Sequence, residues 1–299
     1  MHVTPAEHVP VRLWGLLAGL TFAWGFNWTA MKLALSEVSP FTFRVLCLFV
    51  GGGILMLVMR ANGQSLVVPR GQRLRLVGLA LVSITLWNLL IAFGVSMVPS
   101  SRAAILAYTM PAWAIPLSVW VLGERLTGRK IAGLALGMGG LALLLGEGIA
   151  NLGAAPLGSL LVLAAAVGWA LATVLQKRYP VDMPPGAYTA WIMLLGGVPI
   201  LLCAMVFDDP AALLVISGAA WFGIAYNVLV AFAWAHWAWI RLVTELSVTA
   251  FSLSMLLTPM VGVASGMLFL GERPSATEFV AFALVMASLV SVIVPARGR

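Results

Sequence analysis

Long apolar runs dominate the chain, and short stretches containing Lys, Arg, Pro or Gly separate them. About 20 predominantly apolar residues are enough to cross a bilayer as a helix. The pattern predicts ten such helices, over residues 11–31, 41–59, 74–97, 103–121, 130–146, 158–176, 187–206, 218–243, 247–270 and 277–295. Several gaps hold only a few residues, so neighbouring helices are expected to form antiparallel hairpins in a compact all-α membrane bundle.

Composition supports this interpretation. Of the 299 residues, 62% are hydrophobic and 9% are charged, and the mean hydropathy is +1.05, whereas a soluble domain carries about 25% charged residues. These values exclude a water-soluble enzyme, a disordered scaffold and a nucleic-acid-binding protein. The expected surroundings are a lipid bilayer, and the net charge of +7 fits loops held on the cytoplasmic side.

The distribution of basic residues gives an orientation. Ten helices place thirteen of the 17 Lys and Arg residues on the side of the N-terminus. Three lie on the opposite side, namely Lys32, Arg102 and Arg273, and Arg44 falls within the second helix. Because cytoplasmic loops are enriched in Lys and Arg, both termini are expected to be cytoplasmic, in a bacterial inner membrane.

The chain contains an internal repeat. An offset of 148 carries Pro111 onto Pro259, and carries the Leu-Gly-Glu-Arg sequence at 122–125 onto the same four residues at 270–273. A similar offset of 145 carries Trp24 onto Trp169.

The repeat predicts two related halves, residues 1–150 and 151–299, with five helices each. An odd number of spans per half places the second half inverted in the membrane. Inverted repeats are typical of transporters whose binding site lies near the middle of the membrane, between the halves.

A set of short motifs, taken in order on ten helices, resembles the drug/metabolite transporter superfamily and, within it, the EamA-type transporters. The residues that carry the resemblance are Trp24, Gly25, Lys32, Pro40, Arg44, Pro111 and the Leu-Gly-Glu sequences at 122–124 and 270–272. Within that superfamily the chain is similar to the YddG-type aromatic amino acid exporters. The resemblance implies cavity-lining aromatic residues on the third, fourth and sixth helices. One departure is that Thr189 stands where a second copy of Arg44 would lie.

The helix interiors hold aromatic rings and neutral polar groups, which suit a flat, amphipathic, net-neutral solute because rings stack on rings and buried polar groups need partners. The expected substrate cavity is formed by Trp24, Asn27, Trp87, Asn88, Ile91, Tyr108, Met110, Trp169, Tyr226, His236 and Trp237. A purely structural role is the alternative for each: tryptophans also gather at membrane interfaces, and His236 also suits an internal hydrogen bond.

Four further residues are candidates for a hinge or a gate: Pro111, Pro259, Arg44 and Lys32. Proline interrupts the hydrogen-bond ladder of a helix, so Pro111 and Pro259 are expected to mark moving parts at symmetric depths. Arg44 lies four residues after Pro40, near the outer surface. It could bind a carboxylate bidentately, but the interpretation favoured here is an outer gate or a side chain that extends to the headgroups.

The sequence offers little for catalysis, so the protein is not expected to be an enzyme. The only histidines are His2, His8 and His236, and no glycine-rich phosphate loop opens a helix. No cofactor or metal is expected. Because no Asp or Glu falls at the centre of a predicted span, we expect facilitated, gradient-driven transport.

The sequence therefore predicts an inner-membrane exporter of amino acids, aromatic and other neutral ones favoured, and of related small metabolites. It would work by alternating access around a central cavity. The alternatives are an exporter of another class, such as nucleotide sugars or cationic drugs, and an intramembrane enzyme. One chain can enclose a complete site, so a monomer is sufficient and a dimer is compatible.

Overall fold

The computed structural model describes residues 11–123, 128–150, 156–245 and 257–293. Within these ranges the chain is helical and contains no β-strand. The long uninterrupted helices are α1 (Val11–Leu35), α8 (Gly128–Ala150), α9 (Pro156–Arg178), α10 (Pro185–Phe207) and α15 (Ala276–Ile293).

Three further spans contain π-helical turns, which are rare and widen a helix locally. The first comprises α2 (Pro40–Val45), η1 (Leu46–Gly51) and α3 (Gly52–Ala61). The second comprises α4 (Arg73–Ala80), η3 (Leu81–Leu86) and α5 (Trp87–Met97), preceded by the 3₁₀ turn η2 (Arg70–Gln72). The third comprises α11 (Gly218–Ala225), η5 (Tyr226–Trp234) and α12 (Ala235–Glu245), preceded by the 3₁₀ turn η4 (Pro210–Leu214).

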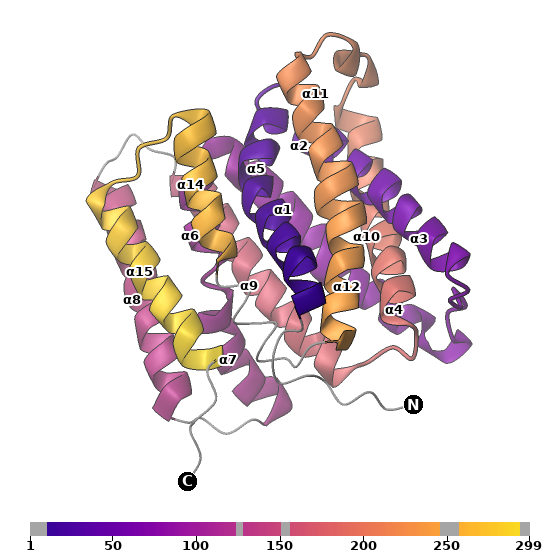
Figure 1. The fold of residues 1–299 in the computed structure, drawn as a ribbon, viewed down its shortest axis with the longest axis horizontal. Coiled ribbons are helices and arrows are strands. Elements are labelled where there is room, and N and C mark those ends of the chain that lie inside the picture. Colours follow the sequence, from indigo (N-terminus) through magenta and orange to yellow (C-terminus); the bar gives the residue numbers. More distant parts are fainter. Residues whose placement is uncertain (1–10, 124–127, 151–155, 246–256, 294–299) are drawn as a thin grey trace.

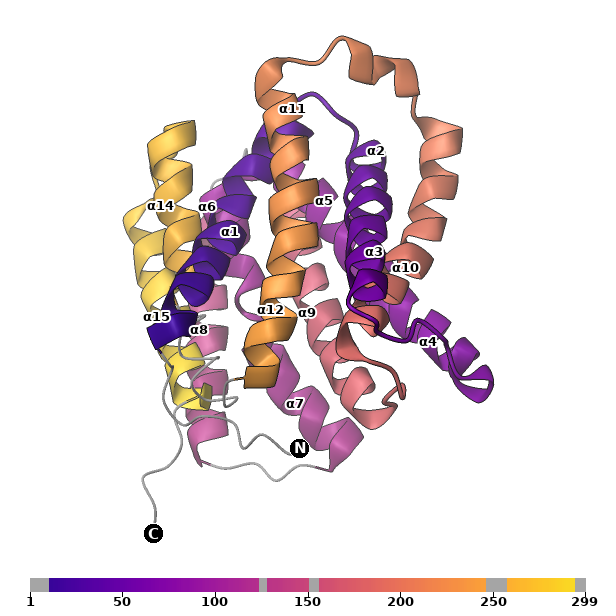
Figure 2. The same cartoon turned by 45° about the vertical axis from the view of Figure 1, so that its right-hand side comes forward.

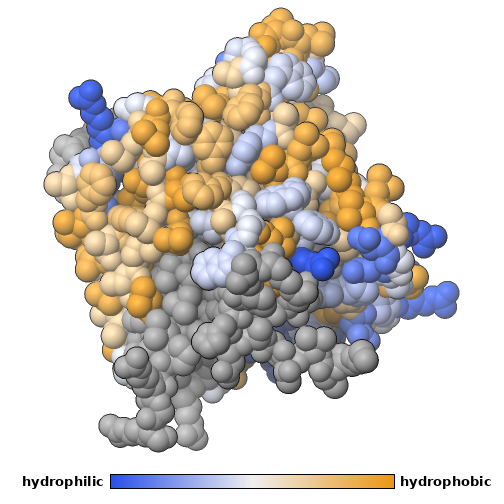
Figure 3. All heavy atoms as spheres, viewed as in Figure 1, coloured by the Kyte–Doolittle hydropathy of each residue, from blue (hydrophilic) through white to orange (hydrophobic). Residues whose placement is uncertain are grey.

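The remaining helices are shorter: α6 (Ser100–Ala107), α7 (Met110–Leu122) and α14 (Thr258–Leu270). Among the described residues, six helical spans are long and apolar enough to cross a membrane, and shorter apolar helices accompany them. Large apolar side chains, such as Leu57, Leu202 and Leu268, are exposed on the outside of the bundle. Figure 3 shows that apolar residues cover much of one face of the molecule. This is the surface expected of a protein surrounded by lipid.

The helices lie side by side in one bundle (Figures 1 and 2). At one edge α8 packs against α15, and at the other α10 packs against α3 and α4. Between these edges α1 contacts α14 and α11, and α9 contacts both α5 and α7. The first turn of α1 and the last turn of α15 lie at the same end of the bundle (Figure 1).

The described helices coincide with the predicted spans. The predicted 41–59 span is found as Pro40–Ala61, and the predicted 187–206 span as Pro185–Phe207. Of the predicted 247–270 span, residues 246–256 lie outside the described part of the chain. The ten-helix count and the cytoplasmic termini therefore stay predictions.

The two Leu-Gly-Glu motifs lie at the ends of helices. Gly123 (φ 68°) and Gly271 (φ 65°) adopt the left-handed conformation directly after α7 and α14. Glycine adopts this conformation without the steric penalty that other residues incur. Glu124 lies outside the described residues, whereas Glu272 is described and makes the contacts given below.

The predicted 103–121 helix is interrupted just before Pro111, where α6 ends at Ala107 and α7 begins at Met110. Whether Pro259 interrupts a helix stays a prediction, because residues 246–256 lie outside the described part of the chain. Both prolines occur in the first turn of a helix, α7 and α14 respectively. The missing proline N–H leaves nothing unpaired there, because the first N–H groups of a helix have no partner within the helix. The prolines found inside helices are Pro116 in α7 and Pro199 in α10.

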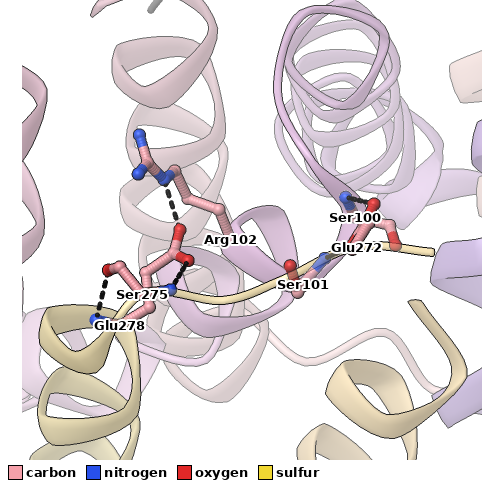
Figure 4. A network of polar contacts seen from close by, with 6 residues as sticks. All are labelled: Ser100, Ser101, Arg102, Glu272, Ser275 and Glu278. Atoms are coloured by element: carbon pink, nitrogen blue, oxygen red, sulfur yellow. Dashed lines mark hydrogen bonds and ion pairs between the residues drawn. The ribbon is translucent and has the colours of Figure 1, made fainter. Parts of the chain in front are cut away.

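Polar contacts join several helix ends at the end of the bundle opposite to the start of α1. Glu272, after α14, accepts hydrogen bonds from the backbone N–H groups of Ser100 (2.6 Å) and Ser101 (2.9 Å) at the start of α6 (Figure 4). Arg102 pairs with Glu278 at 2.6 Å. Glu272 thus caps the start of α6.

Two further acidic side chains, Glu37 and Asp208, accept hydrogen bonds at this end of the bundle. Glu37 accepts hydrogen bonds from Ser217 Oγ (2.5 Å) and Ser217 N (2.7 Å). These bonds stabilise the carboxylate and hold the pKa of Glu37 below its ordinary value. Asp208 accepts hydrogen bonds from Ser39 Oγ and from Thr42 N (2.9 Å), at the start of α2.

Close packing of α1 on α14 depends on Gly25. A Cβ atom there would lie 2.5 Å from Val261 Cβ and 2.9 Å from Thr258 O, whereas one at Gly15 in the same helix would meet nothing within 4 Å. Overpacking of this kind costs about 1–3 kcal/mol. We therefore expect Gly25→Ala to lower the thermal unfolding temperature of the detergent-purified protein, and Gly15→Ala not to lower it. Equal stability of the two variants would contradict this account of the contact.

Candidate functional site

A cavity of about 320 Å³ lies inside the bundle. Its walls come from α1, α2, η3, α5, α9, α10, η5 and α12, together with the break between α6 and α7 and the start of α14. The lining residues are Trp24, Asn27, Trp28, Met31, Arg44, Ile84, Trp87, Asn88, Ile91, Tyr108, Met110, Trp169, Met193, Ala231, Phe232, His236 and Thr258. A volume of this size suits a small molecule.

Nine of the eleven residues predicted for the substrate cavity line this cavity. They are Trp24, Asn27, Trp87, Asn88, Ile91, Tyr108, Met110, Trp169 and His236. They come from helices far apart in the sequence, and the fold brings them together.

Aromatic rings form contacting pairs along the wall. The rings of Trp87 and Trp169 have centroids 4.9 Å apart, at an angle of 57°. The ring centroids of Trp28 and Tyr108 are 6.4 Å apart. Tilted rings at these separations are a favourable geometry for aromatic contacts, and they leave flat apolar surfaces beside the cavity.

Neutral polar groups interrupt the aromatic wall. Asn88 Nδ2 donates to the carbonyl oxygen of Ile84 at 2.9 Å, four residues earlier and within η3. His236 Nδ1 lies 3.1 Å from the carbonyl oxygen of Ala231. Because a carbonyl oxygen only accepts, Nδ1 must carry the hydrogen in this contact. The side-chain oxygens of Asn27 and Asn88 are buried without a hydrogen-bond partner.

Arg44 is buried and does not lie near the outer surface, contrary to what the sequence suggested; its role in gating stays a prediction. Arg44 is only 3% exposed, and it lines the cavity. Arg44 lies one turn into α2, which begins at Pro40 after the N-cap Ser39. From there Nη2 extends to within 2.8 Å of Met31 Sδ on α1. The guanidinium lies over the rings of Phe43 (4.9 Å) and Phe232 (6.0 Å).

Lys32 lies near the end of α1, outside the lining of the cavity. Its Nζ donates to the carbonyl oxygens of Val95 (2.8 Å), Ser96 (3.1 Å) and Val98 (2.8 Å) at the end of α5. These carbonyls are among the last of the helix, which lack partners within it. Lys32 thus joins two helix ends, and its role in gating stays a prediction.

Tyr226 and Trp237, also predicted for the substrate cavity, do not line this cavity. Tyr226 OH donates to Ala23 O at 3.0 Å, and its ring lies 5.1 Å from that of Phe26, between α1 and η5. Trp237 packs against the apolar core. Tyr226 begins the π-helical η5, and Trp237 lies in α12, which follows it.

Sequence reasoning missed seven lining residues: Trp28, Met31, Ile84, Met193, Ala231, Phe232 and Thr258. Helical spacing could have found four of them, because Trp28 and Met31 follow Trp24 at intervals of four and seven, and Ile84 and Phe232 precede Asn88 and His236 by four. Met193 carried no such signal.

The described parts of the chain contain no group of three His, Cys, Asp or Glu side chains that could hold a metal ion. The cavity instead offers rings, amides and one guanidinium. Such a set can bind a small organic solute by stacking and hydrogen bonds.

Comparisons with known proteins agree with this arrangement. The profile of the EamA-like transporter family matches residues 12–146 and again residues 156–294. The chain is 27% identical to a "Probable amino-acid metabolite efflux pump" of Escherichia coli (strain K12), over 95% of this chain and 96% of that protein. It is 25% identical to the "Uncharacterized transporter YoaV" of Bacillus subtilis (strain 168), over 86% of this chain and 88% of that protein.

The fold also occurs in a solved crystal structure. The two chains superpose with a TM-score of 0.66 and 20% sequence identity, over 95% of this chain and 97% of the other.

Proposed function

Because this chain belongs to the EamA-like transporter family, a family of small-metabolite transporters, we propose that it exports amino acids, aromatic and other neutral ones favoured. The observation that carries the proposal is the cavity of about 320 Å³, with indole and phenol rings along its wall and amide groups between them. A relative named as a probable amino-acid metabolite efflux pump points to the same class of solute.

Transport is proposed to proceed by alternating access between two inverted five-helix halves, residues 1–150 and 151–299. The family profile matches once in each half. Under the offset of 148, Pro111 and Pro259 both occupy the first turn of a 13-residue helix, and a left-handed glycine follows each helix. These helices, α7 and α14, lie towards opposite ends of the bundle (Figures 1 and 2), as inversion requires.

The proposed setting is a bacterial inner membrane with both termini in the cytoplasm. The excess of Lys and Arg on the side of the N-terminus supports this orientation. A single chain encloses the whole cavity, so a monomer would be sufficient.

The energy source is proposed to be the solute gradient. Many ion-coupled carriers use a carboxylate inside the membrane, and none of the described residues that line this cavity is Asp or Glu. Export of a neutral amino acid from sealed vesicles is then expected to continue after ionophores collapse the proton and sodium gradients. Complete loss of transport under those conditions would contradict uniport.

Counterflow in liposomes containing the purified protein tests the proposed substrate class. Radiolabelled tryptophan is exchanged against unlabelled tryptophan, with threonine, a nucleotide sugar and a cationic dye as competitors. We expect exchange that amino acids inhibit and the other two do not. Inhibition by the nucleotide sugar or the dye alone, or uptake of either without tryptophan exchange, would replace the proposed substrate class with theirs.

A further inference from the structure

Among the described residues that line the cavity, three each hold a buried polar atom without a hydrogen-bond partner: Arg44 Nε, Asn27 Oδ1 and Asn88 Oδ1. Unpartnered buried polar atoms are rare in folded proteins, and each one calls for an explanation. One of the three is a cationic donor and the other two are neutral acceptors. Because the three residues line one cavity, small side-chain rotations would let a single bound solute contact all three atoms.

Arg44 is the most costly of the three to bury. None of the described carboxylates lies within 4.0 Å of its guanidinium, which contacts a thioether sulfur and two phenyl rings and interacts with the thiol of Cys47. A thioether is a weak acceptor, and ring faces only partly offset the loss of hydration of a cation. A buried guanidinium is therefore best accommodated by an anionic group, and a carboxylate matches its planar fork.

The orientation of the Asn88 amide follows from its partner. Its neighbour at 2.9 Å is the carbonyl oxygen of Ile84, which only accepts, so the NH₂ group must face that carbonyl. The amide oxygen of Asn88 consequently has no hydrogen-bond partner, although the residue is only 2% exposed. An ammonium group, which has three donors and no acceptor, would satisfy such an oxygen.

We propose that the cavity recognises the zwitterionic part of its solute, with Arg44 binding the carboxylate and the amide oxygens of Asn27 and Asn88 accepting hydrogen bonds from the ammonium group. The aromatic wall then contacts the side chain. This inference rests on the proposed function, and it names the residues that determine specificity for a zwitterionic solute. It explains how a cavity without an acidic residue discriminates a zwitterion from a cation of the same shape.

The test uses three ligands that share the indole ring: L-tryptophan, tryptamine, which lacks the carboxylate, and indole-3-propionate, which lacks the ammonium group. Their binding is measured as thermal stabilisation of the purified protein and as inhibition of tryptophan counterflow. We expect tryptophan to bind at least about ten-fold more tightly than either analogue, because each loss leaves a buried polar partner unpaired.

Variants test which residue binds the carboxylate and which binds the ammonium group of the solute. In Arg44→Met the preference for tryptophan over tryptamine should disappear, and in Arg44→Lys, which keeps the charge without the planar fork, it should be reduced. In Asn88→Leu the preference for tryptophan over indole-3-propionate should fall instead. If Arg44→Met does not fold, the wild-type ranking together with Arg44→Lys and Asn88→Leu still tests the inference.

Two controls are matched to these variants. Asn227 makes the same local bond as Asn88, from Nδ2 to the carbonyl oxygen of Gly223 (3.0 Å), and its Oδ1 is also unpartnered, but it does not line the cavity. Asn227→Leu should keep the wild-type ranking of ligands. Arg75 is exposed, and Arg75→Met, which removes a cation outside the cavity, should do the same.

Outcomes for the inference and for the proposed function are separable. Equal binding of tryptophan and tryptamine to the wild-type protein, or an unchanged ranking in both Arg44→Met and Asn88→Leu, would overturn the inference even if amino acid exchange occurs. Conversely, the ranking could follow Arg44 in the thermal assay while no amino acid is exchanged. The inference would then hold, and the proposed export function would fail.

Discussion

Replacing Trp87 and Trp169 together with alanine is expected to reduce tryptophan exchange by at least about ten-fold, since burial of one large apolar side chain contributes roughly 1.5–3 kcal/mol. The two indole rings contact each other at 4.9 Å between centroids and both line the cavity. Each single variant should lose less, because the remaining ring still offers a stacking surface. Initial rates of counterflow in proteoliposomes measure the effect.

A control for this experiment removes an indole elsewhere. Trp120 is 82% exposed on the outside of α7, so Trp120→Ala should keep the wild-type rate. Wild-type exchange by the double variant would show that the aromatic wall does not contact the solute. A loss of rate in Trp120→Ala equal to that in the double variant would point to a general effect of removing tryptophan.

Glu272→Ala is expected to destabilise the protein by about 1–3 kcal/mol for each backbone N–H left unpaired. The carboxylate accepts bonds from Ser100 N and Ser101 N at the first turn of α6, where a negative charge also interacts favourably with the helix dipole. This contact joins α14 of the second proposed half to α6 of the first (Figure 4). Its loss should favour opening of this end of the bundle.

Thermal unfolding in detergent measures the stability, and alkylation of Ser101→Cys in a background without Cys47 and Cys203 measures opening. Glu37→Ala is the matched control, because Glu37 also accepts two hydrogen bonds, from Ser217 N and Oγ, but in an exposed position. We expect a clearly smaller loss of stability there. A Glu272→Ala variant as stable as Glu37→Ala, with unchanged alkylation, would contradict this role for Glu272.

Helix positions and most of the lining residues could be predicted from the sequence, because both depend on local patterns. Apolar runs located the spans, and the repeated Leu-Gly-Glu motif coincides with two helix ends that carry a left-handed glycine, Gly123 and Gly271. Rings and amides inside apolar runs identified nine lining residues, since such groups are costly to place in a membrane without a partner.

The errors concern features that depend on residues distant in sequence. Tyr226 and Trp237 were predicted to line the cavity as aromatic rings inside an apolar run, and neither lines it. Tyr226 begins η5, whose π-helical turns change the direction of the residues that follow. No local pattern revealed η5, and none could show that Arg44 turns inward to Met31 and Phe232, which lie on other helices.

Protection of a cysteine in the cavity tests most directly the claim that the transported solute binds there. Met110 lines the cavity, and Met110→Cys in a chain without Cys47 and Cys203 provides a single thiol for a small maleimide. The account predicts that tryptophan slows alkylation over the same concentration range in which it saturates counterflow. Alkylation at an unchanged rate under saturating tryptophan would contradict it.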